Sequence, residues 1–482
     1  MPDNIPWLAL LPEILLSSFG VLVMLGDAAM APGRKWALGM VTLLGIYCAG
    51  AAALTSYAVS PGRAFSGMIV VDGAATFFRL LITVIGLVTV LASMSYLRRN
   101  RLPQGEYYVL ILFSMAGQGL MAASGEMILL FLGLEISSLS TYVLAGFLRQ
   151  DSRSSESALK YFFLGSFATA FLLYGVALIY GAAGTTELAA IRAAIRNGEA
   201  EGGLIAAGAA LLFVGLAFKV SAAPFHIWTP DVYQGAPSPV TAFLSTGPKA
   251  AAFAIFLRVF FTALPEAGPV WVLVSWISAF LSMLIGNFGA LVQNNIKRML
   301  AYSSIAHAGY VLVAFTAGSE VGAAAAMFYL AAYAAMNLGA FVVVSHFASR
   351  GERYVEIDDY AGLGRRRPFL AATLAIFLLS LAGIPLTGGF FGKFYIFRAA
   401  VEADLIGLTV LGLMNTALAA YYYLRVMVVM YMEEPRETAP VAPLPPGIAA
   451  AIVLSVAATF YLGIFPGGVL RFATESAAGW GR

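Results

Sequence analysis

Charged residues are scarce in this chain: they make up 11% of its 482 residues, where ordinary soluble domains have about 25%. Hydrophobic residues make up 60%, which is more apolar surface than a water-soluble fold can bury. They form stretches of about twenty residues, the length of helix that crosses the roughly 30 Å hydrocarbon layer of a bilayer. The composition therefore predicts an all-α polytopic membrane protein.

Cysteine and histidine are almost absent. Cys48 is the only cysteine, and His226, His307 and His346 are far apart in the sequence. No disulfide can form within the chain, and no Cys or His cluster has the spacing of a metal or iron–sulfur site. The formal net charge is only +3, and the basic residues lie in short clusters, which argues against nucleic-acid binding. We expect no cofactor in this chain and a lipid bilayer around it.

The apolar runs, separated by charged or Pro/Gly-rich breaks, predict about fourteen transmembrane helices. They lie near 5–26, 36–58, 74–96, 107–123, 126–148, 158–181, 203–223, 238–263, 268–291, 299–317, 321–348, 369–399, 403–431 and 446–466. Asp3 and Glu13 stand where a cleavable signal peptide would carry positive charge, so the first run is interpreted as a permanent span. The segment 185–203 has helical periodicity but is too short and charged to span, and we expect it on the outer surface.

The distribution of lysine and arginine between the loops predicts the orientation. The odd-numbered loops hold fifteen of these residues: Arg34, Lys35, Arg98, Arg99, Arg101, Arg149, Arg153, Lys297, Arg298, Arg350, Arg353, Arg365, Arg366, Arg367 and Arg436. The even-numbered loops and the C-terminus hold six: Arg63, Arg192, Arg196, Arg398, Arg471 and Arg482. Basic residues accumulate on the cytoplasmic side. Both termini are therefore expected on the periplasmic face of a bacterial inner membrane.

Seven basic residues remain within the predicted spans or at their edges: Arg79, Lys160, Lys219, Lys249, Arg258, Lys393 and Arg425. Arg258 and Arg425 are interpreted as reaching the membrane interface with their long side chains. Lys160 fits either that interpretation or a functional one. Lys219 and Lys393 do not fit the interfacial interpretation well, because each lies deep in a long apolar run.

Lys219 and Lys393 both lie beside residues that break helices. Pro224 follows the first lysine, and Pro385 and a glycine-rich stretch precede the second. A broken helix in lipid is tolerated only where protein or water meets its freed backbone groups, so these positions are expected to line a hydrated interior. Lysine can lose its charge there, whereas arginine stays protonated. Each lysine is thus placed where protons can move.

Three further residues lie at similar depth. Glu135 is the expected counter-charge of Lys219, and changes in their distance would switch proton affinity; the alternative is a static ion pair that holds helices together. Lys249 lies about eleven residues into its predicted span. His307 is either a hydrogen-bonded packing residue or part of a proton relay through its neighbours in the sequence. Those neighbours are Tyr302, Ser303, Ser304 and Tyr310.

The spacing of these residues suggests an internal repeat. Lys393 follows Lys219 by 174 residues, and His307 follows Glu135 by 172. Each half would hold five helices, and because five is odd the second copy would be inverted, with sites near the midplane. The predicted segments are 1–106, a first repeat 107–263, a second repeat 264–432 and a C-terminal helix with its tail, 433–482.

The chain resembles the antiporter-like membrane subunits of proton-pumping NADH–quinone oxidoreductase, respiratory complex I. The stretches that carry the resemblance are FKVSAAPFHIWTPDVYQGAPSPVTAFLSTGPK (218–249), NIKRMLAYSSIAHAGY (295–310) and LAGIPLTGGFFGKFYIF (381–397), supported by LGLEISSLSTYVL and ESALKYFFLGSF. Among the sister types, the N type is favoured over L and M. Three features favour the N type: a lysine at position 249 within STGPK, a lysine rather than a glutamate at position 393, and no long lateral helix after the last span.

The resemblance implies fourteen helices, two inverted five-helix repeats, and breaks in the seventh and twelfth. It also implies proton translocation along Glu135, Lys160, Lys219, Lys249 and Lys393. Other subunits are expected to hold the FMN, the iron–sulfur clusters and the quinone site. The expected partners are the antiporter-like subunit M and the small subunit K.

Two other functions stay open at this point. One is a sodium/proton antiporter, because antiporter subunits share the broad pattern of the family. The other is a structural subunit whose buried charges only fix helix register. Both assign the same residues to the membrane interior and differ in what those residues do.

Overall fold

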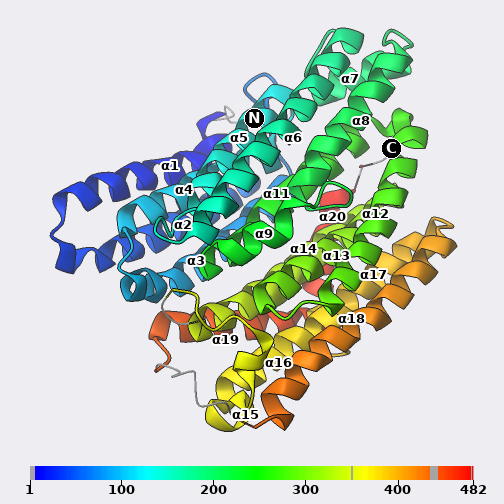
Figure 1. Cartoon of the computed structure of the whole chain (residues 1–482). Helices are drawn as coiled ribbons and strands as arrows, with labels where there is room; N and C mark the ends of the chain where they lie inside the picture. The colour runs from blue at the N-terminus through cyan, green and yellow to red at the C-terminus, as the bar shows by residue number, and fades with distance from the viewer. Residues whose placement is uncertain (1–5, 349–350, 435–442, 479, 481–482) are drawn as a thin grey trace.

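The computed structural model describes residues 6–348, 351–434, 443–478 and 480, and these are almost entirely helical (Figure 1). Asp3, Arg350, Arg436 and Arg482 lie outside the described residues. The N-terminal elements are α1 (Pro6–Ala29), η1 (Pro32–Arg34), α2 (Trp36–Val59), β1 (Gly62–Ala64), β2 (Ile69–Val71) and α3 (Gly73–Asn100).

The rest of the chain is divided by short loops and by helix interruptions. The elements up to residue 267 are α4 (Gln104–Ala123), α5 (Met127–Ala145), α6 (Ser152–Ala183), α7 (Leu188–Arg196), α8 (Gly202–Lys219), α9 (Trp228–Gly235), α10 (Ser238–Leu244), α11 (Gly247–Arg258), η2 (Val259–Ala263) and η3 (Pro265–Ala267). The later elements are α12 (Gly268–Leu291), α13 (Ile296–Thr316), α14 (Glu320–Phe347), η4 (Ile357–Tyr360), α15 (Leu363–Arg366), α16 (Pro368–Ala382), α17 (Gly388–Glu402), α18 (Ile406–Met432), α19 (Pro446–Ile464) and α20 (Gly467–Ala477).

Twelve helical segments of the described residues are long and apolar enough to cross a membrane. The remaining two predicted crossings correspond to α4, which has 20 residues, and to the interrupted pair α16 and α17. The prediction of about fourteen crossings is therefore confirmed. The boundaries differ from the prediction by several residues. The largest differences are at the end of the seventh crossing, where α9 ends at Gly235 rather than near 223, and at the start of α6, which begins at Ser152 rather than near 158.

The helix order repeats in the two halves of the chain. In the first half α4, α5 and α6 precede the interrupted pair α8 and α9, and then α10 and α11; in the second half α12, α13 and α14 precede the interrupted pair α16 and α17, and then α18. This agrees with breaks in the seventh and twelfth crossings. The crossing formed by α10 and α11 is interrupted as well, at 245–246, which was not predicted although Gly247 and Pro248 mark it.

The non-spanning elements β1, β2, α7 and η3 pack on one another. β1 and β2 form an antiparallel hairpin, and Arg63 on β1 makes an ion pair of 2.6 Å with Glu187, which precedes α7. Arg192 on α7 pairs with Glu266 on η3 at 3.3 Å. The segment 185–203 thus contains a short helix, as predicted, that is tied to the loop after α11.

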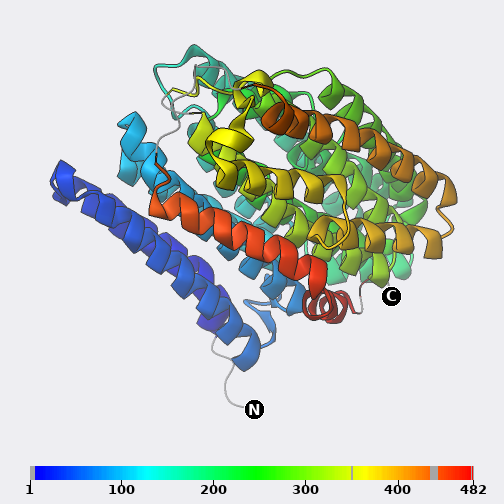
Figure 2. The ribbon, with the colours of Figure 1, turned by 90° about the horizontal axis from the view of Figure 1, so that it is seen from below.

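The centre of the fold is formed by α10 and α11, α13 and α14. In each of these three crossings 94% of the apolar 18-residue stretch is buried inside the protein, whereas in the crossings that contain α1, α6 and α12 the share is 33%. Seen from below, α1 and α2 lie at one edge of the molecule and α18 at the opposite edge (Figure 2). The central helices are thus shielded by other helices, and they carry Lys249 and His307.

Candidate functional site

The first helix break places Lys219 at the last position of α8. Pro224 lacks a backbone N–H and helps to keep the chain from continuing as a helix. Two serines of α12 satisfy the backbone of the break: Ser282 Oγ accepts from the Ala223 N–H at 2.8 Å, and Ser278 Oγ donates to the Ala223 carbonyl at 2.6 Å. The break is therefore stabilised inside the protein, as non-helical backbone within a membrane requires.

Lys219 contacts hydroxyl groups of α5. Its Nζ donates to Ser138 Oγ at 2.8 Å and to the Tyr142 hydroxyl at 3.0 Å. Glu135 lies on the same helix, where its Oε1 accepts from Thr169 Oγ1 of α6 at 2.9 Å. Within the described part of the chain Glu135 makes no ion pair with Lys219, so the structure does not contain the static pair that would lock these helices together.

Lys249 lies in the first turn of α11, directly after the unpredicted interruption. Its Nζ donates to the Ser304 carbonyl at 2.9 Å and to Ser304 Oγ at 2.6 Å. The Tyr333 hydroxyl of α14 donates to the same Ser304 Oγ at 2.8 Å. Asn337, one turn further along α14, donates to Ser245 Oγ in the interruption at 2.7 Å. Ser304 thus holds this lysine with its hydroxyl and carbonyl, and an amide of α14 satisfies the interruption that precedes it.

His307 lies on α13 between two tyrosine hydroxyls. Its Nδ1 is 2.5 Å from the Tyr329 hydroxyl, and its Nε2 is 3.2 Å from the Tyr423 hydroxyl. Ser303 Oγ is hydrogen-bonded to the same Tyr423 hydroxyl at 2.5 Å. The ring of Tyr333, which belongs to the Lys249 group, lies 5.1 Å from the histidine ring. His307 is therefore connected toward Lys249 by packing and toward α18 by hydrogen bonds.

The hydrogen-bond partners of His307 differ from the sequence neighbours that were expected to form a relay with it. Ser304 bonds Lys249 instead of the histidine, and Tyr310 accepts a hydrogen bond from Thr416 at 3.2 Å while its ring packs edge-on against His307. The direct partners of His307 come from α14 and α18. The sequence offered no signal for them, because tyrosines in apolar helices are common packing residues.

Lys393 closes the row at the second helix break. It lies on α17, and its Nζ donates to the carbonyls of Leu381 and Ala382 at 3.0 and 3.1 Å. These are among the last carbonyls of α16, which have no partner within their own helix and carry its negative dipole end. The ammonium also lies 4.8 Å from the centre of the Tyr310 ring.

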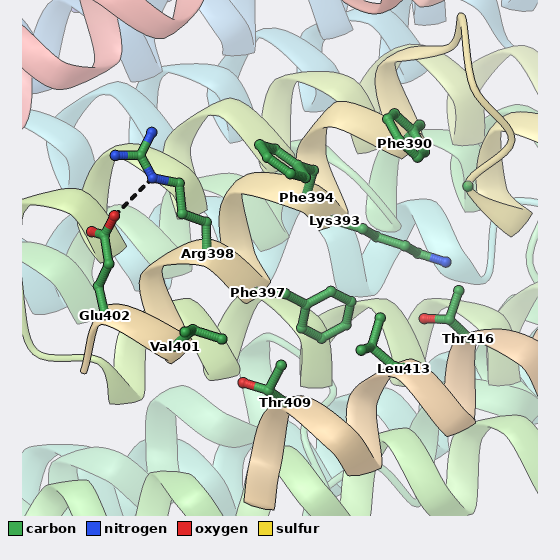
Figure 3. Close-up of a pocket in the computed structure, with 11 residues that line it drawn as sticks. Phe390, Lys393, Phe394, Phe397, Arg398, Val401, Glu402, Thr409, Leu413 and Thr416 are labelled. Atoms are coloured by element: carbon green, nitrogen blue, oxygen red, sulfur yellow. Dashed lines mark hydrogen bonds and ion pairs between the residues drawn. The ribbon is translucent and has the colours of Figure 1, made fainter. Parts of the chain in front are cut away.

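A cavity of about 570 Å³ borders Lys393 on the side of α17 and α18 (Figure 3). Arg398 and Glu402 pair at 2.7 Å on its wall, and Figure 3 shows Lys393 pointing away from this pair, toward Thr416. The charge of Lys393 is therefore not neutralised by Glu402.

Lys160 lies outside this row. Its Nζ makes ion pairs with Asp231 at 2.6 Å and with Glu156 at 2.7 Å, and its side chain is 41% exposed. Asp231 also binds Arg298 on α13 at 2.6 Å. The charge of Lys160 is thus held at the rim of the helix bundle and is connected through Asp231 to the second half of the chain, which fits both interpretations of this lysine.

The interpretation of Arg258 as an interfacial side chain is wrong. Its side chain is only 5% exposed and binds both oxygens of Asp72, at 2.8 and 2.9 Å. Burial acts to raise the pKa of Asp72, but the charge of Arg258 and hydrogen bonds outweigh it and hold that pKa below its usual range. Arg425, in contrast, reaches loop groups at Gln293 and Asn294, as expected.

Between the Lys219 group and the Lys249 group lies Tyr233 of α9. Its hydroxyl is close to the hydroxyls of Ser221 and Ser304, and it has no hydrogen-bond partner among the described residues. Tyr233 is fully buried. It therefore provides a polar group where the two lysine groups approach one another.

No group of three His, Cys, Asp or Glu side chains suited to a metal ion is found in the described residues. What the arrangement does provide is a row of ionisable groups separated by hydroxyls. Such a row can hand protons along hydrogen bonds without a resident metal.

Comparisons with known proteins identify the family of the chain. The family described as NADH:quinone oxidoreductase/Mrp antiporter, transmembrane, matches residues 124–419. NADH-quinone oxidoreductase subunit N 1 of Solibacter usitatus is 57% identical over 472 residues, which cover 98% of this chain and 97% of the relative. NADH-quinone oxidoreductase subunit N of Trichlorobacter lovleyi is 45% identical over 468 residues, which cover 97% of this chain and 96% of the relative.

Solved structures show the same fold. A chain of respiratory complex I from Thermus thermophilus superposes with a TM-score of 0.82 at 38% identity, over 96% of this chain and 99% of that one. A chain of the Mrp complex from Dietzia sp. gives a TM-score of 0.84 at 21% identity, over 99% and 97%; this second likeness concerns the fold alone. The chain therefore belongs to the NADH:quinone oxidoreductase/Mrp antiporter family and, within it, to the N-type membrane subunits of NADH-quinone oxidoreductase.

Proposed function

We propose that this subunit translocates protons through the row Glu135, Lys219, Lys249, His307 and Lys393, driven by NADH oxidation and quinone reduction elsewhere in the complex. One observation carries the proposal: the three lysines of the row are held by hydroxyls, carbonyls and rings, and none has an ion pair among the described residues. A lysine without a fixed counter-charge can be neutral at one stage and charged at another.

The rim residue Lys160 and the bridging residue Tyr233 complete the proposed route. Lys160 and its partner Asp231 exchange protons with the aqueous side, and the Tyr233 hydroxyl passes protons between the groups of Lys219 and Lys249. Tyrosine and serine hydroxyls both donate and accept hydrogen bonds, as such a transfer requires.

The decisive substitution is Lys219→Ala. Proton pumping by inverted membrane vesicles and coupled NADH–quinone turnover should be lost while the assembled complex keeps its size on native gels. Glu135→Gln should also impair pumping, because it removes the charge and retains the shape. The matched control is Lys35→Ala, since Lys35 is paired with Asp27 at the loop after α1. An unchanged pumping stoichiometry in Lys219→Ala would refute the proposal.

We further propose that the chain has no redox activity of its own, that FMN, iron–sulfur clusters and quinone bind to other subunits, and that subunits M and K are its neighbours. Its place is then a bacterial inner membrane with both termini on the periplasmic side. These statements are tested by tagging the chain in its native membrane and extracting it gently. NADH–quinone reductase activity and bound flavin should migrate with it.

A sodium/proton antiporter is the second candidate, and the shared fold of the Mrp chain is the observation that keeps it. Membranes that contain this chain but lack the other subunits of the oxidoreductase separate the two functions. Sodium-dependent proton movement in such membranes would favour the antiporter, and its absence together with the loss of pumping in Lys219→Ala would favour the oxidoreductase subunit.

A further inference from the structure

A groove of about 540 Å³ lies between α3, α14, α19 and α20, and it contains none of the residues of the proposed proton route. α14 borders it with Ala331, Ala334 and Ala335, whose short side chains leave the space open. At its edge Val84 of α3 and Leu454 of α19 are 53% and 51% exposed. Because α3 and α19 are membrane-spanning helices, the groove opens sideways into the hydrocarbon layer.

The lining of the groove selects an apolar occupant. Ser455 is one of its few polar side chains, and its hydroxyl has no hydrogen-bond partner among the described residues. A buried water molecule needs two to four polar partners, which this lining does not offer. Hydrocarbon, by contrast, gains by contact with alanine, leucine and phenylalanine side chains in place of empty space. The chemistry of the walls is that of an acyl-chain site.

One end of the groove lies against the start of α20 and the Tyr461 side chain. α20 passes there, with Val469 and Phe472 lining the groove and Arg471 exposed. Arg471 has no ion pair within the part of the chain that the structure describes. The Tyr461 hydroxyl lies beside the first turn of α20, 3.3 Å from where a Cβ on Gly468 would be. The first N–H groups of that helix have no intrahelical partner and favour an anion.

We propose that the groove holds one acyl chain of a membrane phospholipid, with its phosphate at the start of α20 near Arg471 and Tyr461. The arrangement supports this: the apolar groove ends at the start of α20, where the Tyr461 hydroxyl and the first N–H groups of the helix can meet a phosphate, and Arg471 is exposed one turn further on. A partner helix would need a broad apolar face rather than a groove that ends at the start of α20. The lipid would fill a seam between the N-terminal helices, the second half of the chain and its C-terminal helix.

The experiment uses the intact complex reconstituted in nanodiscs that contain phosphatidylglycerol with a photoreactive diazirine in mid-chain. Peptide mass spectrometry then locates the labelled residues. Labelling of 331–338 and 454–462 should exceed that of the exposed residues Leu22, Leu25 and Leu44 at least fivefold. Equal labelling of both faces would mean that only ordinary boundary lipid is present and would overturn the proposal.

Two variants sharpen the result. Ala334→Leu fills the groove and should reduce its labelling at least fivefold, whereas Ala51→Leu, on the exposed face of α2, should leave it unchanged. Arg471→Glu leaves the groove intact and should lower labelling by phosphatidylglycerol more than by a zwitterionic probe. Unchanged labelling in both Ala334→Leu and Arg471→Glu overturns the proposal. So does displacement of the lipid probe by an isoprenoid quinone, which would assign the groove to a different ligand.

Discussion

Buried cations occur in two kinds of surroundings in this molecule. In one kind the cation is paired with a carboxylate, as in Arg79 with Glu13 at 2.8 Å, Arg258 with Asp72 at 2.8 Å and Lys297 with Glu352 at 3.2 Å. In the other kind Lys219, Lys249 and Lys393 are held by neutral groups alone. The paired charges are fixed in place by their partners, while the lysines of the row have no carboxylate that fixes their charge.

The two kinds also differ in position. The paired cations connect helices that are distant in sequence: α1 with α3, the start of α3 with the end of α11, and the start of α13 with the loop after α14. The unpaired lysines lie at helix interruptions, where hydroxyl and carbonyl groups are available inside the membrane. This division separates the charges that hold the bundle together from those proposed to carry protons.

The largest loss of stability is expected when one member of a buried pair is removed. Glu13→Ala leaves Arg79 with the Ala9 carbonyl as its hydrogen-bond partner, and the free energy of unfolding should fall by about 3–5 kcal/mol. The unfolding midpoint in detergent measures this. Glu106→Ala, in an exposed pair with Arg149, is the control, and the comparison fails if both variants lose the same stability. Replacing Glu13 and Arg79 together by leucine should restore most of the loss.

A smaller, pH-dependent effect is expected at Glu352 in the loop after α14. Burial acts to raise its pKa, but the charge of Lys297 and hydrogen bonds from Ser238 and Tyr96 outweigh burial and hold it below the usual value. A depressed carboxyl pKa contributes stability above the unfolded pKa of about 4.3, and this is lost as pH falls through the lower folded pKa. Unfolding midpoints of Glu352→Gln should vary less between about pH 3 and pH 6 than those of the parent. Parallel curves would contradict this.

Removing a lysine of the row should have the opposite effect: a small change in stability and a large loss of proton pumping. Lys249→Met removes a charge that has no carboxylate partner, and Ser304 keeps its bond from Tyr333. The free energy of unfolding should therefore change by less than about 1.5 kcal/mol, while proton pumping is lost. Arg258→Met is the matched control: it leaves Asp72 unpaired and should destabilise more. A Lys249→Met complex that pumps normally would count against the proposed route.

The smallest change in stability is expected at the rim. Lys160→Ala breaks two ion pairs that water screens, which should cost no more than about 1 kcal/mol. Pumping should slow without disappearing, because the aqueous side can reach Asp231 without the lysine. Initial pumping rates at matched amounts of complex measure this. Complete loss of pumping would move Lys160 into the obligatory part of the route.

Much of the fold was predictable because lipid restricts the options. A spanning helix needs about twenty apolar residues, so the runs around Trp36–Val59 and Ile406–Met432 could be identified from composition. The breaks beside Lys219 and Lys393 were marked by proline and glycine. The interruption before Lys249 was missed, since Gly247 and Pro248 lie within a run apolar enough to appear continuous.

The partners of the site residues were not predictable, because they are remote in sequence. Lys219 and Ser138 are 81 residues apart, and His307 and Tyr423 are 116 apart. Arg258 was misjudged for the same reason, because its partner Asp72 is 186 residues away. Nothing local to an arginine near a helix end distinguishes a buried pair from an interfacial side chain.

The sequence by itself determined that the chain resides in a membrane, where its helices cross, and which of its lysines lie in the interior. The reason is that apolar length and the cost of an intramembrane charge are properties of each segment alone. Only the tertiary structure decided which buried cations meet a carboxylate and which meet hydroxyls, since that depends on how distant helices pack. The difference between a structural charge and a proposed proton carrier therefore arises from packing, not from residue type.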